Sequence, residues 1–161
     1  MIVELNNLEY VMCTQIAMMR HERNRNSKVQ DKTIWTDVPK MHVETLGVMG
    51  EFAFCKWANK YPPLDTSPQS GTTDIIYDQW KCDIKVTERK DGRLIVSQWK
   101  KKESSDVYIL GIVDGLTVDF VGFATNDEIF DDARLKDLGR AVCYCMDQSE
   151  LTRFKDEPKV A

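Results

Sequence analysis

Hydrophobic positions near the N-terminus recur three or four residues apart, as on one face of a helix: Leu8, Val11, Met12, Ile16 and Met19. Asn6 or Asn7 fits the N-cap position before them. The next stretch, HERNRNSKVQDK, is polar and has no periodicity. We therefore expect an amphipathic first helix followed by a solvated loop, with contacts from Arg20, Arg23 and Arg25 to phosphates as the alternative.

A second helix is predicted from about Val43 to Lys60, because no helix continues through Pro62-Pro63. Its core stripe is Leu46, Met49, Ala53 and Trp57.

Glu51 is unusual within this second helix. Its neighbours one turn away are all non-polar, namely Gly47, Val48, Phe54 and Cys55, so its carboxylate does not fit a solvated face. Glu44 has Lys40 beside it and fits an exposed acid near a helix start, where the helix dipole favours it. We favour Glu51 over Glu44 as the functional acid.

Strand patterns follow the irregular loop from Tyr61 to Thr73. They cover Thr73–Tyr77, Trp80–Thr87, Leu94–Trp99, 107–113 and 118–124. Asp114-Gly115 is a strong hairpin signal between the last two. The continuously apolar segment 107–113 is typical of a central strand covered on both faces.

The remaining pattern completes a prediction of one α/β domain over residues 1–161. TNDE (Thr125–Glu128) fits a capping box that opens a short third helix through IFDDARL, whereas the tail GRAVCYCMDQSELTRF is weakly patterned. We expect a central mixed β-sheet of about five strands flanked by helices.

Composition supports this fold class and restricts the functions. The chain has 161 residues, 42% hydrophobic and 30% charged, which is typical of a globular domain. No apolar run could span a bilayer and no basic segment leads into an apolar stretch, so we expect no membrane contact and a cytoplasmic location. Five scattered cysteines predict reduced thiols. The net charge of −4 argues against a surface that binds DNA over its whole extent.

The stretch TTDIIYDQWKCDIKVTE places charged residues within a predicted hairpin. If Asp78 and Gln79 form its two-residue loop, Asp74 lies opposite Asp83. Lys85 then points to the same side, because strand side chains alternate. Two carboxylates about 5 Å apart repel by roughly 3 kcal/mol at an effective dielectric of 20, so a lysine or a divalent cation must compensate. An exposed cross-strand charge pattern is the alternative.

These residues resemble the signature of the PD-(D/E)XK nuclease superfamily, which has the restriction endonuclease-like fold. GEFAF (Glu51), SGTTD (Asp74) and CDIKVTE (Asp83, Lys85) follow in the order of a helix acid, a strand acid and an acid-x-Lys. Thr73 stands where the family often has proline. This resemblance covers about Glu44 to Val121. The sequence as a whole also resembles small proteins encoded by bacteriophages, which would place the protein in the cytoplasm of the host.

The resemblance implies a Mg²⁺- or Mn²⁺-dependent deoxyribonuclease. Asp74, Asp83, the main-chain carbonyl of Ile84 and Glu51 would hold the metal, and Lys85 would position or help deprotonate the attacking water. Gln98, Lys100 and Lys101 would contact the DNA substrate.

Three interpretations stay open at this point. The first is a metal-dependent nuclease, which acts as an endonuclease or an exonuclease and for which a homodimer is one expected assembly. The second is a catalytically inactive nuclease-fold module that binds nucleic acid or a protein partner. The third is an α+β domain with surface acids, in which Glu51 lies far from Asp74 and Asp83.

Overall fold

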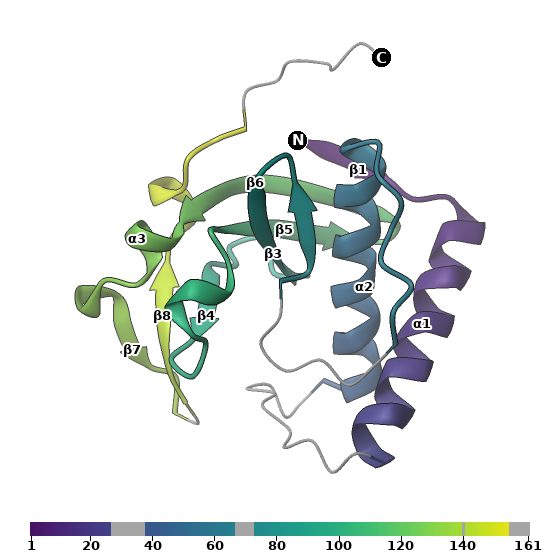
Figure 1. Ribbon diagram of the computed structural model, residues 1–161, viewed down its shortest axis with the longest axis horizontal. Helices are drawn as coiled ribbons and strands as arrows, with labels where there is room; N and C mark the ends of the chain where they lie inside the picture. Colours follow the sequence, from purple (N-terminus) through teal and green to yellow (C-terminus); the bar gives the residue numbers. More distant parts are fainter. Residues whose placement is uncertain (27–37, 67–72, 140, 155–161) are drawn as a thin grey trace.

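The computed structural model describes residues 1–26, 38–66, 73–139 and 141–154. Its elements in chain order are β1 (Ile2–Glu4), α1 (Asn7–Asn26), α2 (Lys40–Trp57), β2 (Ile75–Tyr77), β3 (Trp80–Thr87), β4 (Leu94–Ser97), β5 (Val107–Asp114), β6 (Thr117–Thr125), α3 (Asn126–Ile129), β7 (Leu135–Asp137) and β8 (Val142–Met146) (Figure 1). Short 3₁₀ turns lie at Lys102–Ser104, Asp132–Arg134 and Gln148–Glu150.

A mixed five-stranded sheet forms the centre of the fold, in the order β1-β6-β5-β3-β2. β3 and β5 are parallel, and the other pairs are antiparallel. β5 lies in the middle, as its continuous apolar run predicts, and most of its residues are buried. The α/β class and the five-stranded mixed sheet flanked by helices are therefore confirmed.

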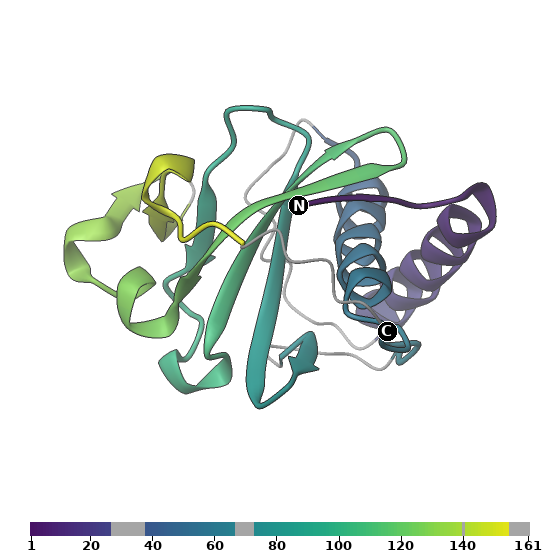
Figure 2. The same cartoon turned by 90° about the horizontal axis from the view of Figure 1, so that it is seen from above.

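α2 covers one face of this sheet, and α1 packs on the outside of α2 (Figure 2). The four positions of the predicted α2 stripe all pack in this core: Leu46, Met49, Ala53 and Trp57. A Cβ added at Gly50 would lie 2.5 Å from Val86 Cγ1 and 3.2 Å from Ile84 Cγ2. The helix backbone therefore lies directly against β3, on the face that carries Ile84 and Val86.

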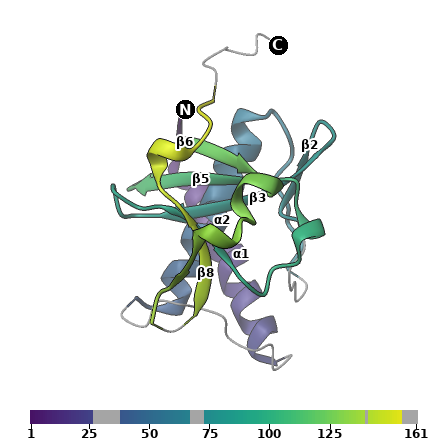
Figure 3. The same cartoon turned by 90° about the vertical axis from the view of Figure 1, so that its left-hand side faces the viewer.

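The opposite face of the sheet carries a second core beneath a three-stranded sheet in the order β4-β8-β7. Tyr108 and Leu110 of β5 pack there with Leu94, Val96 and Met146. Figure 3 looks onto the molecule from the side of this second sheet. The sequence pattern did not indicate it, because β8 is only five residues long and β7 only three.

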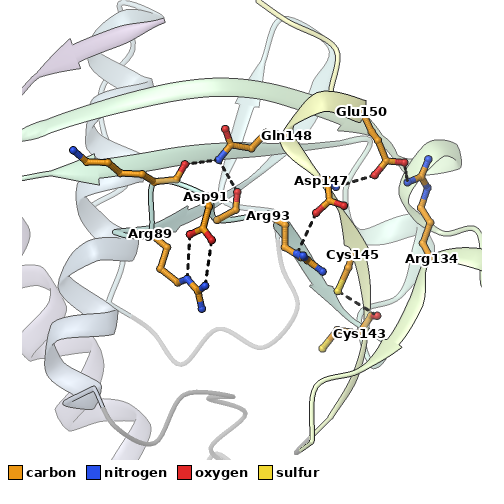
Figure 4. Close-up of polar contacts among 11 residues, drawn as sticks. Arg89, Asp91, Arg93, Arg134, Cys143, Cys145, Asp147, Gln148 and Glu150 are labelled. Carbon is orange, nitrogen blue, oxygen red and sulfur yellow. Dashed lines mark hydrogen bonds and ion pairs between the residues drawn. The ribbon is translucent and has the colours of Figure 1, made fainter.

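Polar contacts join the chain after β8 to the turn before β4 (Figure 4). The Gln148 side-chain amide donates to the carbonyls of Lys90 (2.9 Å) and Gly92 (2.7 Å). Arg93 forms an ion pair with Asp147 at 3.2 Å. These contacts fix the second sheet relative to the end of β3.

Two hairpins have the tight turns that the sequence indicates. Tyr77 pairs with Trp80, so Asp78 and Gln79 form the β2–β3 turn as predicted. Asp78 has φ of 54°, a left-handed conformation that aspartate tolerates. The β5–β6 turn lies one residue later than expected, with Asp114 paired to Thr117 and Gly115 at φ of 59°.

α1 differs from the prediction in two respects. It continues to Asn26, so the expected loop from His21 was wrong for residues 21–26. Its buried face consists of Cys13, Ile16 and Ala17, whereas most of the predicted stripe is exposed: Leu8, Val11, Met12 and Met19. The periodicity was right, but apolar residues on α1 also cover the side that faces away from α2.

Other local expectations hold with small changes. The capping box is present, with Thr125 accepting from the Glu128 backbone N–H, but α3 is only four residues long. β4 ends at Ser97, before Trp99. All five cysteines are free and buried. In the described part of the chain, no helix is long and apolar enough to cross a membrane.

Candidate functional site

Asp83 lies in the middle of β3 and is fully buried. Its two carboxylate oxygens contact two different ammonium groups, Oδ1 that of Lys85 and Oδ2 that of Lys100. Lys85 lies two residues along the same strand, so both side chains point to the face covered by the second sheet. A buried carboxylate is stable only with partners such as these.

Lys100 reaches Asp83 from the turn after β4. Its backbone N–H donates to the Ser97 carbonyl at 2.9 Å, which tightens this turn. Its side chain is 12% exposed, and Nζ lies 5.9 Å from the centre of the Tyr108 ring. Because Tyr108 is the β5 partner of Asp83, aromatic ring, carboxylate and ammonium all lie on one face of the sheet.

Asp74 lies just before β2, at the edge of the sheet. Its backbone N–H donates to the Cys82 carbonyl at 3.2 Å. Cys82 is paired with Ile75 in the β2–β3 register, so the pairing of the two strands becomes irregular at Asp74. Its Oδ2 accepts from the Ile84 backbone N–H at 2.8 Å. The Asp74 carboxylate therefore bonds to the edge of β3 beyond the end of β2, and does not simply face Asp83 across the ladder.

The Ile84 carbonyl points toward this same edge. The carbonyl groups of successive residues in a strand point in alternating directions. In β3 the Lys81 carbonyl accepts from the Asp106 N–H at 2.8 Å, on the β5 side, and the Cys82 carbonyl accepts from the Asp74 N–H, on the β2 side. Ile84 is two residues from Cys82, so its N–H and its carbonyl share the direction of the Cys82 peptide group.

Glu51 comes from α2, on the other face of β3. Its side chain is 12% exposed, which agrees with the non-polar surroundings that the sequence predicts. Arg20 binds it with two hydrogen bonds, each of 2.9 Å, and donates from Nε to the Asp65 carbonyl at 3.2 Å. Burial alone would lower the pKa of Arg20, but Glu51 and then Asp74 raise it, so the guanidinium stays charged.

The charges of the other candidate residues shift the pKa of Asp74. The pKa of Asp74 is raised to about 7, mainly by burial and then by the charges of Asp83 and Glu51. The charge of Lys85 and the hydrogen bond from Ile84 lower it. For Lys85, burial lowers the pKa, but the charges of Asp83 and Asp74 raise it above its ordinary value.

The structure thus brings Glu51, Asp74, Asp83 and Lys85 together around the part of β3 beyond the end of β2, with the acids of α2 and β3 on opposite faces. Lys100 joins them at Asp83. The side chains of Gln98 and Lys101 are exposed and make no contact with Asp83. Glu44 lies elsewhere on α2, half-buried, with its Oε1 3.0 Å from His21 Nδ1.

Arg20 is the site residue that sequence reasoning missed. It was considered only as an alternative phosphate contact, although it lies four residues after Ile16 and three after Ala17, on the buried face of α1. Extending the helical period past Met19 would have found it.

The donor set fits a hard divalent cation in its chemistry. Mg²⁺ is usually held by one or two carboxylates together with water and phosphate oxygens. Asp74, Asp83 and the Ile84 carbonyl are oxygen donors of that kind at one strand edge. Within the described residues, no three acidic, cysteine or histidine side chains are gathered into a ready metal-binding group.

The fold and site together define an α/β protein with a buried acid–lysine cluster at a sheet edge. The chain belongs to the family of unknown function DUF5843, which it matches over residues 3–115. The match includes α1, α2 and the sheet through β5, and hence every residue of the cluster. Comparison with curated proteins and with solved structures gave no match.

Proposed function

We propose that this protein hydrolyses phosphodiester bonds of DNA with the help of Mg²⁺ or Mn²⁺, and that its core is a variant of the restriction endonuclease-like fold. The supporting observation is that the other three acid and lysine residues of the motif, Asp83, Glu51 and Lys85, lie close enough to Asp74 for their charges to shift its pKa. A surface charge pattern would not place residues so distant in sequence around one half-buried acid.

Asp74, Asp83 and the Ile84 carbonyl would hold the cation, and Glu51 would join directly or through water. The cation supplies a more acidic bound water and a counter-charge for the phosphate. The protein's own residues place the acids: the Ile84 N–H orients the Asp74 carboxylate, and Lys85 and Lys100 each contact one oxygen of the Asp83 carboxylate.

Lys85 acts as a hydrogen-bond donor in this proposal. Its pKa is raised and it contacts Asp83, so it carries a proton and cannot accept one from water in this arrangement. An ammonium near the reacting phosphate stabilises the charge that develops in the transition state. Lys100, which shares Asp83, would support the same charge, while the exposed Gln98 and Lys101 would contact more distant parts of the DNA.

Calorimetry with Mn²⁺ tests the metal site, and cleavage tests the activity. Wild type should bind Mn²⁺ and cut at least one of supercoiled, linear, single-stranded or branched DNA. Asp74→Ala should bind Mn²⁺ at least tenfold more weakly and lose cleavage. Asp78→Asn is the matched control and should retain both, because it removes an exposed acid at the tip of the same hairpin while asparagine tolerates the left-handed backbone there.

A second function is favoured by the internal pairing of the acids. Asp83 has two lysine partners and Glu51 has an arginine partner, so both are neutralised by the protein itself. An inactive module that binds nucleic acid or a protein would need no cation. Binding of DNA without Mn²⁺ uptake and without cleavage would favour this module over the nuclease.

A further inference from the structure

The outer face of α1 carries an apolar stripe, defined here as Leu8, Val11, Met12, Gln15, Met18, Met19 and Glu22. Its five hydrophobic side chains are between 38% and 70% exposed. The opposite face of the same helix buries Cys13, Ile16 and Ala17 against the core. α1 is therefore apolar on two sides, and only one of them is covered by α2 (Figure 2).

The stripe repeats every seven residues. Leu8, Gln15 and Glu22 are seven apart, as are Val11 and Met18, and Met12 and Met19. Apolar positions alternating at three and four residues form the seam through which one helix packs along another. A second helix is thus the partner geometry that fits the stripe, rather than a strand or a loop.

We propose that α1 pairs with α1 of a second copy of this chain, antiparallel, about a two-fold axis at Gln15. This register places Val11 opposite the second copy's Met19 and Met12 opposite its Met18, so the apolar positions meet one another. The two Gln15 amides meet at the axis, where they can hydrogen-bond. A stripe that is complementary to itself in this way is what a two-fold interface requires.

Charge favours the antiparallel direction and a second copy as the occupant. Glu22 is the one charged position of the stripe. In the antiparallel register it lies opposite Leu8, beside the first turn of the other α1, where the positive end of the helix dipole favours an acid. In a parallel pair the two Glu22 carboxylates would face each other and repel.

This assembly does not depend on the proposed hydrolysis. Arg20 lies on the side of α1 that contacts α2, so the interface leaves the Arg20–Glu51 pair untouched. The two candidate sites of the dimer would be connected through the paired α1 helices.

Sedimentation equilibrium over a range of protein concentrations tests the pairing. The full chain should reach twice its 18.6 kDa mass. Met12→Lys together with Met18→Lys should raise the dimer dissociation constant at least tenfold while circular dichroism stays unchanged. Tyr61→Lys, which replaces another exposed apolar residue, is the control and should dimerise like wild type. A wild-type mass of one chain at every concentration would overturn the proposal.

Cysteine cross-linking tests the direction. Gln15→Cys should form an intermolecular disulfide under mild oxidation, because the two Gln15 positions meet at the axis. Leu8→Cys should not, because the two Leu8 positions are about 21 Å apart along antiparallel helices that rise about 1.5 Å per residue. All five native cysteines are buried, which keeps the background low. A disulfide at Leu8→Cys, or none at Gln15→Cys, would contradict the antiparallel pair.

Discussion

Arg20 and Glu51 form a two-pronged ion pair that joins α1 to α2, with both nitrogen–oxygen distances at 2.9 Å. The charge of Asp74 also raises the pKa of Arg20, so two acids of the cluster act on one guanidinium. The Glu51 carboxylate thereby has a counter-charge although its side chain is only 12% exposed. The pair contributes to the tertiary fold as well as to the candidate site.

Arg20→Ala should destabilise the protein by about 2–3 kcal/mol, because it leaves the Glu51 carboxylate without its counter-charge in a largely buried position. Urea unfolding followed by circular dichroism measures the change. Arg89→Ala is the control, since the Arg89–Asp91 pair is 65% and 80% exposed (Figure 4) and should leave the unfolding midpoint nearly unchanged. Equal midpoints for the two variants would mean that the Arg20–Glu51 pair does not stabilise the fold.

The sequence predicted those parts of the site that depend on residues close together in the chain. The Asp78-Gln79 turn and the alternation along β3 are local, so the pairing of Tyr77 with Trp80 and the shared face of Lys85 and Asp83 followed from sequence. That α2 lies on the face opposite Asp83 is set by its packing on Val86, a tertiary contact with no local signal.

The same limit applies to the fold. β5 is continuously apolar, and buried residues alternate with less buried ones along β6. Both strands were predicted because the hydrophobic pattern of each segment indicates its burial without information from other segments. β7 and β8 are short and belong to a small second sheet, whose stability comes from residues elsewhere in the chain. The exposed stripe of α1 misled the prediction of its buried face, since an exposed apolar face has the same periodicity as a core face.

The raised pKa of Asp74 predicts a dependence of stability on pH. The folded protein holds this proton up to about pH 7, whereas the unfolded chain releases it near the ordinary value of 3.8. The unfolding free energy should therefore fall as the pH rises from about 4 to 7 and lose nothing further from this group above 7. Each unit of pKa shift corresponds to about 1.4 kcal/mol, so the total is on the order of a few kcal/mol.

Asp74→Asn should remove this dependence, because the amide can still accept from the Ile84 N–H but does not ionise. In EDTA, the stability of the variant relative to wild type should rise between pH 5 and pH 8. Mn²⁺ should then stabilise wild type and leave the variant unchanged, since a cation favours the ionised acid. A constant difference between the two proteins across this range would mean that Asp74 ionises normally.

The two lysines at Asp83 should be energetically coupled through it. Lys100→Ala is expected to cost about 1–3 kcal/mol, because the fully buried Asp83 loses one of its two partners. In the Asp83→Asn background the same change should cost much less, since no carboxylate charge is left to compensate. A double-mutant cycle in urea measures this coupling, and simple additivity of the two changes would contradict the contact.

Close packing of α2 on β3 can be tested with two glycines of the same helix. Gly50→Ala should destabilise the protein by about 1–3 kcal/mol, because the new Cβ would lie 2.5 Å from Val86 Cγ1 and push the helix away from the strand. Gly47→Ala should be neutral or stabilise by up to about 1 kcal/mol, because no atom lies within 4 Å of its Cβ and alanine favours the helix.

The position of Glu51 provides a second readout for this pair of variants. Glu51 directly follows Gly50, so displacement of α2 should weaken the coupling between Arg20 and Glu51 in a double-mutant cycle. Gly47→Ala should leave that coupling at its wild-type value. If Gly50→Ala proved as stable as Gly47→Ala, α2 would not lie against Val86 as the structure has it, and the approach of Glu51 to the edge of β3 would have to be reconsidered.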